Sequence, residues 1–148
     1  MSALAHGTMV MERTYYASPT RVFNAWGDID ARVRWSAPTP ADKIVYEAQD
    51  FREGGLDISH CGRDGDLDYT ARVTYLSIKA NSLIVFTETV SYRGERKSHA
   101  QISVELFPAG AGTRLLLTMQ IASFDGQAMI AGYDEGWTAA LDNLASEF

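Results

Sequence analysis

The chain has 148 residues, a length typical of one domain that buries a single hydrophobic core without a metal ion or a disulfide. Its formal net charge of -6 opposes binding to phosphate backbones and to anionic lipid, so neither nucleic acid nor a membrane is an expected partner. Cys61 is the only cysteine, and no stretch approaches the roughly 20 apolar residues that span a bilayer, which together indicate a cytoplasmic protein.

The N-terminal residues predict a short leader followed by a strand. Residues 1–7 carry no cationic segment with an apolar run after it, and we interpret them as a loose leader. Residues 8–16 are rich in β-branched, aromatic and apolar side chains, which favours a first strand. The domain is therefore expected to comprise residues 8–148.

Two short helices are predicted after this strand. Ser18 suits the N-cap position of the first helix, and Pro19 suits its first turn. Asp28 can cap a second helix that ends at Trp35, before Pro38 and Pro40 prevent its continuation. The predicted inward residues of this second helix are Ile29, Val33 and Trp35.

Six more strands and one long helix complete the predicted order. Glycine-rich breaks divide residues 43–92 into a four-strand meander, and residues 97–107 and 113–121 predict a hairpin. Residues 126–148 have helical periodicity, with an apolar stripe formed by Ile130, Tyr133, Trp137, Leu141 and Leu144. This segregation indicates an α+β fold with an antiparallel sheet. One helix cannot fill the concave face of a strongly bent sheet, so we expect a cavity.

Short motifs recur in order from Glu12 to the C-terminus. The first half contains Glu12-Arg13, Ala17-Ser18-Pro19-Thr20-Arg21-Val22-Phe23, Ala25-Trp26, Trp35, Pro38 and Phe51-Arg52-Glu53-Gly54-Gly55. The second half contains Phe107-Pro108-Ala109-Gly110-Ala111-Gly112-Thr113-Arg114-Leu115, then Gly136-Trp137 and Ala140-Leu141-Asp142-Asn143-Leu144. In this order the motifs resemble the START-like helix-grip superfamily, in the branch related to the activator of the 90-kDa heat-shock protein ATPase.

The resemblance implies a helix-grip fold, in which a curved antiparallel sheet, two short helices and a long C-terminal helix enclose a cavity. The superfamily includes lipid carriers, polyketide cyclases, enzymes of aromatic compounds and chaperone regulators. The fold alone therefore does not choose the function, and the residues that face the cavity must do so.

The strand that follows Gly55 has two alternative faces. The resemblance implies that its inward residues are Asp57, Ser59 and Cys61. The hydrophobic pattern instead prefers inward Leu56, Ile58 and His60. A one-residue slip exchanges the two faces, so this choice decides whether the cavity is polar or apolar.

The resemblance also places Phe86 and Glu88 at inward positions of a later strand. Two carboxylates, of Asp57 and Glu88, would then share the cavity. Burial and mutual repulsion would raise the pKa of at least one of them, which suits acid–base catalysis or the binding of a basic ligand. The alternative is that both carboxylates are solvated on outer faces.

Four further residues are candidates for the cavity lining. Tyr133 and Trp137 lie four apart on the long helix and share its sheet-facing side, where they can stack on a flat ligand or pack in the core. The resemblance places Trp35 at the cavity mouth, as a gate or as a plug. Met119 is inward on the last strand, where a flexible side chain adapts to a ligand or fills a gap.

Other features exclude some chemistry. His60 and Cys61 are adjacent on a strand and point to opposite faces, which disfavours a nucleophilic pair. The histidines and Cys61 show no zinc-site spacing, and no glycine-rich phosphate loop follows a strand, so neither a metal nor a cofactor is expected. Gly132 and Gly136 weaken the long helix, either to leave room for a ligand, to allow bending, or to permit close contact with the sheet.

Three functions are compatible with these features. The first is a binding protein that holds a small apolar or aromatic ligand against Tyr133 and Trp137, with Asp57 and Glu88 orienting a polar group. The second is a cavity enzyme of the cyclase, dehydratase or hydrolase type that uses a buried carboxylate. The third is regulation of a chaperone ATPase through an outer surface, although a dedicated two-domain co-chaperone would have a further domain. A homodimer is expected if Leu56 and Ile58 face outward.

Overall fold

The computed structural model describes residues 4–63 and 65–148 of the chain. Its elements are β1 (Ala5–Tyr15), α1 (Pro19–Gly27), α2 (Ile29–Ser36), β2 (Asp42–Ala48), β3 (Leu56–Arg63), β4 (Tyr69–Lys79), β5 (Leu83–Tyr92), β6 (Glu95–Ala109), β7 (Gly112–Ser123) and α3 (Gln127–Leu144), followed by a 3-10 turn (Ala145–Glu147). The seven strands form one antiparallel sheet in the order β1-β7-β6-β5-β4-β3-β2. The predicted α+β class and element order are confirmed.

Strand β1 begins earlier than the sequence pattern indicates. Residues 5–7 pair with residues 121–123 of β7. The interpretation of residues 1–7 as a loose leader is therefore wrong for residues 5–7, and residues 1–3 lie outside the described part. Alanine and glycine have little intrinsic preference for strands, and here the pairing with β7 overrides it. Gly7 also has a packing reason, because a Cβ at this position would lie 2.8 Å from Cγ2 of Ile130 on α3.

The two short helices form as their caps predict. The side chain of Ser18 accepts a hydrogen bond from the Arg21 backbone N–H at 3.2 Å, and that of Asp28 accepts one from the Asp30 N–H at 3.0 Å. The predicted inward face of α2 is partly wrong, because Val33 is exposed while Arg32 is buried beside Trp35. Arg32 turns inward because it forms an ion pair with Asp57.

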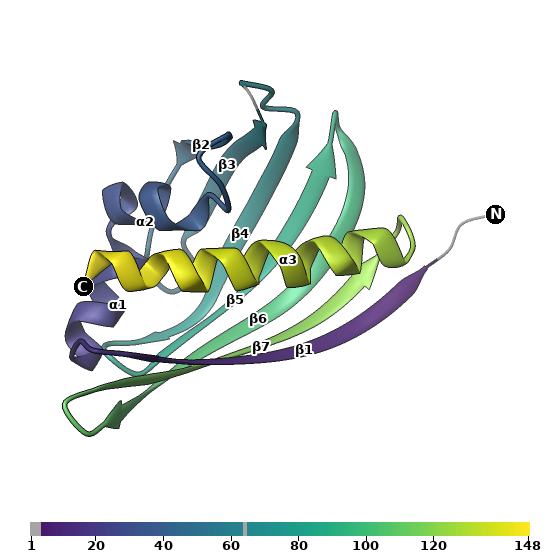
Figure 1. Cartoon of the computed structure of the whole chain (residues 1–148). Coiled ribbons are helices and arrows are strands. Elements are labelled where there is room, and N and C mark those ends of the chain that lie inside the picture. Colours follow the sequence, from purple (N-terminus) through teal and green to yellow (C-terminus); the bar gives the residue numbers. More distant parts are fainter. Residues whose placement is uncertain (1–3, 64) are drawn as a thin grey trace.

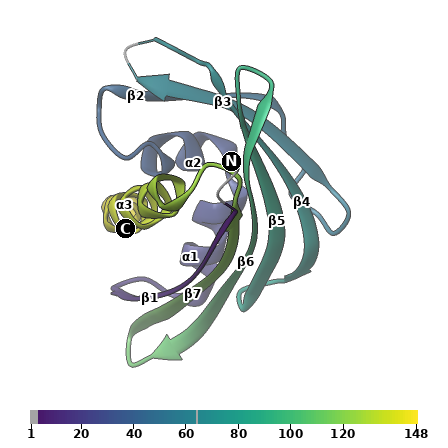
Figure 2. The same cartoon turned by 90° about the vertical axis from the view of Figure 1, so that its right-hand side faces the viewer.

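The sheet curves around α3, which crosses its concave side (Figures 1 and 2). On one half of the sheet, the inner residues of β6 and β7 and the residues of α3 join a continuous core, with fully buried side chains that include Ile102, Leu117, Met119, Leu141 and Leu144. On the other half, β2 to β5 are covered by α2 and by the opposite flank of α3. Bulges in β2, β4 and the β5–β6 pairing interrupt the ladders there, and bulges increase local bending. The candidate functional site lies in this second half.

Candidate functional site

A cavity of about 560 Å³ lies between strands β2 to β5 and the helices α2 and α3. This volume is in the range of small-molecule sites, roughly 300 to 1,000 Å³. Much of its wall is aromatic, and the rings belong to Trp26, Trp35, Tyr46, Tyr69, Tyr75, Phe86, Tyr133 and Trp137. Strands β1, β6 and β7 contribute no lining residue among those that the structure describes.

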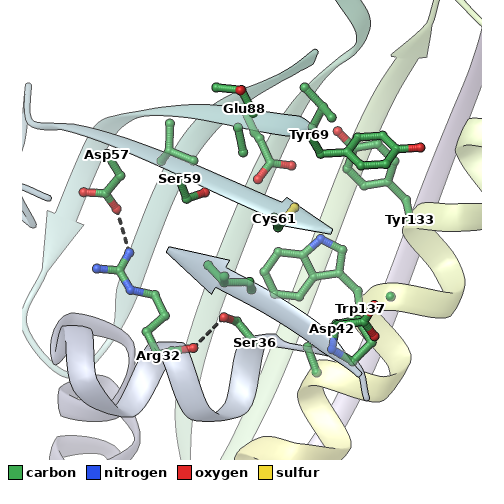
Figure 3. A pocket seen from close by; sticks show the side chains of 18 of the residues that line it. Arg32, Ser36, Asp42, Asp57, Ser59, Cys61, Tyr69, Glu88, Tyr133 and Trp137 are labelled. Atoms are coloured by element: carbon green, nitrogen blue, oxygen red, sulfur yellow. Dashed lines mark hydrogen bonds and ion pairs between the residues drawn. The ribbon is translucent and has the colours of Figure 1, made fainter. Parts of the chain in front are cut away.

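The inward face of β3 carries Asp57, Ser59 and Cys61, as the family resemblance implied (Figure 3). These residues pair across the ladder with Val73, Ala71 and Tyr69 of β4, which also line the cavity. The alternative register, based on hydrophobic pattern, is wrong for this strand. Leu56 and Ile58 lie on the other face, and the self-association expected for that arrangement stays a prediction.

Asp57 is buried in a polar cluster with Arg32 and Tyr75. Nη1 of Arg32 donates to Oδ2 of Asp57 at 2.6 Å and contacts the Tyr75 hydroxyl at 2.6 Å. The Tyr75 hydroxyl donates to the same carboxylate oxygen at 2.5 Å, and the Asp50 backbone N–H donates to the other oxygen at 2.9 Å. Both oxygens of Asp57 are therefore occupied by groups of the protein itself.

The guanidinium of Arg32 is a buried structural cation. Burial lowers the pKa of Arg32, but Tyr46, Tyr75 and Asp57 more than offset this effect and hold the pKa above its ordinary value. The Tyr46 ring lies 5.0 Å from the guanidinium carbon, which adds a cation–π contact. Nε and Nη2 of Arg32 have no hydrogen-bond partner among the described residues and are closed off by packing.

Glu88 on β5 points into the same cavity but lies on the side of Tyr133 and Trp137, apart from the Arg32–Asp57 pair (Figure 3). Burial raises the pKa of Glu88 from 4.5 to about 7, and hydrogen bonding from Tyr133 only partly lowers it. The Tyr133 hydroxyl also lies 2.9 Å from Oγ of Ser98, so its position is fixed from β6. Near neutral pH the Glu88 carboxyl can therefore either donate or accept a proton.

The predicted aromatic candidates have different positions. Tyr133 and Trp137 both line the cavity, and the Trp137 ring stacks on Trp26 with the ring centroids 5.8 Å apart and an interplanar angle of 13°. Trp35 is 1% exposed, its Nε1 donates to the Ala25 carbonyl at 2.9 Å, and its ring packs on Trp26. Trp35 therefore plugs one end of the cavity and is too deeply buried to act as a gate.

Met119 is the one predicted lining residue that lies elsewhere. It is fully buried in the core half of the sheet, where it pairs with Met9 on β1 and Ile102 on β6. Its inward direction was predicted correctly, but α3 packs directly over β7 and leaves no space at this position. Met119 fills the core.

Gly132 and Gly136 line the cavity on α3, and a Cβ added at either position would meet no atom within 4 Å. The explanation by close helix–sheet contact is therefore wrong, and these glycines leave open space beside the Tyr133–Trp137 face.

We expect Gly136→Ala to raise the free energy of unfolding by about 1 kcal/mol, because alanine restricts the unfolded chain and favours the helix. Urea denaturation measures this change. Gly7→Ala, which would place its Cβ against Ile130, should instead destabilise the protein.

Cys61 is not suited to nucleophilic chemistry. Burial, together with smaller contributions from the nearby Glu88 and Asp42, raises the pKa of its thiol from 9.0 to about 11. At about pH 8 the thiolate fraction is then roughly a hundredfold below that of an ordinary cysteine, and we expect alkylation by iodoacetamide to be slower by a similar factor. A rate equal to that of a reference peptide thiol would contradict this environment.

Sequence reasoning missed Arg32, Tyr46 and Tyr75. A usable signal existed for Arg32, because a carboxylate placed inward at Asp57 requires a cation or several hydrogen-bond donors nearby.

Among residues 4–63 and 65–148, no group of three or more potential metal ligands occurs, and no helix has the length and apolar character to cross a membrane.

The comparisons with known proteins agree with this architecture. The family model described as "Activator of Hsp90 ATPase homolog 1-like protein" matches residues 16–148. The chain is 34% identical to the Mll3558 protein of Rhizobium loti, with 99% of each chain covered and a TM-score of 0.87. A protein of Rhizobium leguminosarum is 27% identical, with 99% and 97% covered and a TM-score of 0.85.

A more distant likeness supports the fold alone. Protein CV1439 of Chromobacterium violaceum is 21% identical, with 95% and 96% of the two chains covered and a TM-score of 0.76. No curated protein matches the chain. The family match, the two rhizobial structures and the helix-grip architecture together show that the chain belongs to the Activator of Hsp90 ATPase homolog 1-like family, within the START-like superfamily.

Proposed function

We propose that this protein binds a small aromatic or apolar molecule in the cavity between β2 to β5 and the helices α2 and α3. The observation that carries the proposal is the cavity itself, whose volume of about 560 Å³ is enclosed by eight aromatic side chains. Transfer of an apolar ligand surface from water into such a wall is favourable by roughly 25 cal/mol per Å². A few polar groups at fixed positions then select the ligand.

The arrangement of charges in the cavity also favours a ligand that is largely apolar. Asp57 and Arg32 neutralise each other at one end of the cavity, and both oxygens of Asp57 accept hydrogen bonds from the protein. The aromatic wall and the Glu88 carboxyl are left to contact a ligand. Asp57 therefore supports the cavity wall and does not orient the ligand.

Titration with Nile red, a neutral dye whose fluorescence rises in apolar surroundings, tests this proposal. We expect saturable binding of one dye molecule per chain. Ala71→Trp adds a large ring to the cavity wall on β4 and should abolish binding. The matched control is Thr74→Trp, on the exposed face of the same strand, which should bind the dye as the wild type does. Equal binding by both variants would place the dye elsewhere and overturn the proposal.

A second candidate function is proton transfer catalysed by Glu88. The observation that favours it is a carboxyl with a pKa of about 7 that faces an aromatic cavity, which is the condition under which a general base is effective. Solvent-deuterium exchange at the carbon acid β-tetralone, followed by NMR, is the test. A catalyst should accelerate exchange by about 10²-fold or more, and Glu88→Gln should remove the acceleration.

A further inference from the structure

The cavity lining contains one charge that the protein does not balance. Its charged residues are Arg32, Asp42, Asp57, Arg63 and Glu88. Arg32 pairs with Asp57 at 2.6 Å, and Arg63 pairs with Asp42 at 3.5 Å. Glu88 has no ion-pair partner among the described residues. When Glu88 ionises, the cavity therefore carries a net negative charge.

The groups around Glu88 do not supply a positive charge. Its ladder neighbours are Val73 on β4 and Ala100 on β6, which are uncharged. The titratable groups that face it are Tyr46 on β2, Cys61 on β3 and Tyr133 on α3. Burial raises the pKa of all three groups, so that each is neutral near pH 7. No described cation contributes to the titration of Glu88.

The rest of the wall near Glu88 is aromatic. Tyr133 and Trp137 lie beside it on α3 (Figure 3). Phe86, two residues earlier on β5, and Tyr46 on β2 also line the cavity. The faces of aromatic rings attract cations, and a carboxylate among several rings is a recognition site for organic ammonium groups. Arg32 does not compete for this site, because its charge is bound to Asp57.

We propose that the ligand is an aromatic amine whose protonated nitrogen pairs with Glu88 while its ring packs against Tyr133 and Trp137. This inference rests on the proposed binding function and adds the chemical class of the ligand. A carboxylate ligand would bring a second negative charge next to Glu88, and burying two unpaired anions is costly. An alcohol of the same shape can accept or donate a hydrogen bond but leaves an ionised Glu88 unbalanced.

Tryptamine and tryptophol provide a matched pair of probes, because they share an indole ring and a two-carbon chain and end in an ammonium and a hydroxyl group. Their dissociation constants are measured by calorimetry for the wild type and for Glu88→Gln. At about pH 8, where Glu88 is ionised, we expect the wild type to bind tryptamine at least about tenfold more tightly than tryptophol. Glu88→Gln should lose this preference.

The preference should also depend on pH. Lowering the pH from about 8 to about 5.5 protonates Glu88 and should weaken tryptamine binding about tenfold, whereas tryptophol binding should not weaken. Tryptophol binding as tight as that of tryptamine at about pH 8, or a preference for tryptamine that survives in Glu88→Gln, would overturn the amine assignment and leave the binding function intact. If the wild type binds neither probe and also fails to bind Nile red, the binding function itself is wrong.

Discussion

Asp57→Ala should lower the free energy of unfolding by about 3 to 5 kcal/mol, because it leaves the Arg32 guanidinium buried without its anion. Arg32 and Asp57 are 7% and 2% exposed, so the guanidinium would remain largely desolvated. Tyr75 would also lose the carboxylate to which its hydroxyl donates. Urea denaturation monitored by far-ultraviolet circular dichroism measures the loss.

Two comparisons separate this ion pair from ordinary surface charges. Asp142→Ala removes an exposed partner of Arg13 and should cost less than about 1 kcal/mol. The double-mutant cycle of Asp57→Asn and Arg32→Met should give a coupling free energy of roughly 1 to 3 kcal/mol, because the two side chains act as one unit. Additive effects of the two substitutions would show that the pair does not hold α2 against β3.

Glu88→Gln should have the opposite effect on stability. A carboxyl whose pKa is higher in the folded than in the unfolded state binds more protons when folded, so ionisation destabilises the fold as the pH rises. The rise from 4.5 to about 7 corresponds to roughly 3 kcal/mol, since each pKa unit is about 1.4 kcal/mol. The stability of the wild type relative to Glu88→Gln should therefore fall by about this amount between about pH 4 and about pH 8, mainly between the two pKa values.

Denaturation curves at several pH values check this dependence. Glu135→Gln, the same chemical change on the exposed side of α3, is the matched control. A difference between wild type and Glu88→Gln that is constant with pH would mean that the carboxyl is solvated in the folded protein. If Glu88→Gln is more stable than the wild type at about pH 8 and also loses the preference for the amine, then Glu88 is a residue that serves binding and lowers the stability of the fold.

The fold was predictable from the sequence because its signals are local. Ser18-Pro19 and Asp28 cap the short helices, glycines mark several of the turns between strands, and the helical stripe of residues 127–144 is continuous. The start of β1 at Ala5 was not predictable, because residues 5–7 become a strand only through their pairing with β7.

The candidate site was predictable only where the family resemblance supplied the direction of a strand. Hydrophobic pattern alone would have turned Leu56 and Ile58 inward and missed Asp57. The reason is physical: Asp57 is buried because Arg32, 25 residues earlier in the chain, neutralises it. Hydrophobic periodicity contains no information about such a non-local pair. For the same reason it predicted that Val33, and not Arg32, faces inward on α2.

The most direct test of the account is to locate a bound aromatic ligand by NMR. Nuclear Overhauser effects are measured between the indole protons of tryptophol and the methyl groups of the labelled protein. We predict contacts with the methyl of Ala71, which lines the cavity, and none with the methyls of Leu76, which is exposed on the same strand. Contacts with Leu76 in place of Ala71 would show that the ligand binds outside the cavity and would contradict the account.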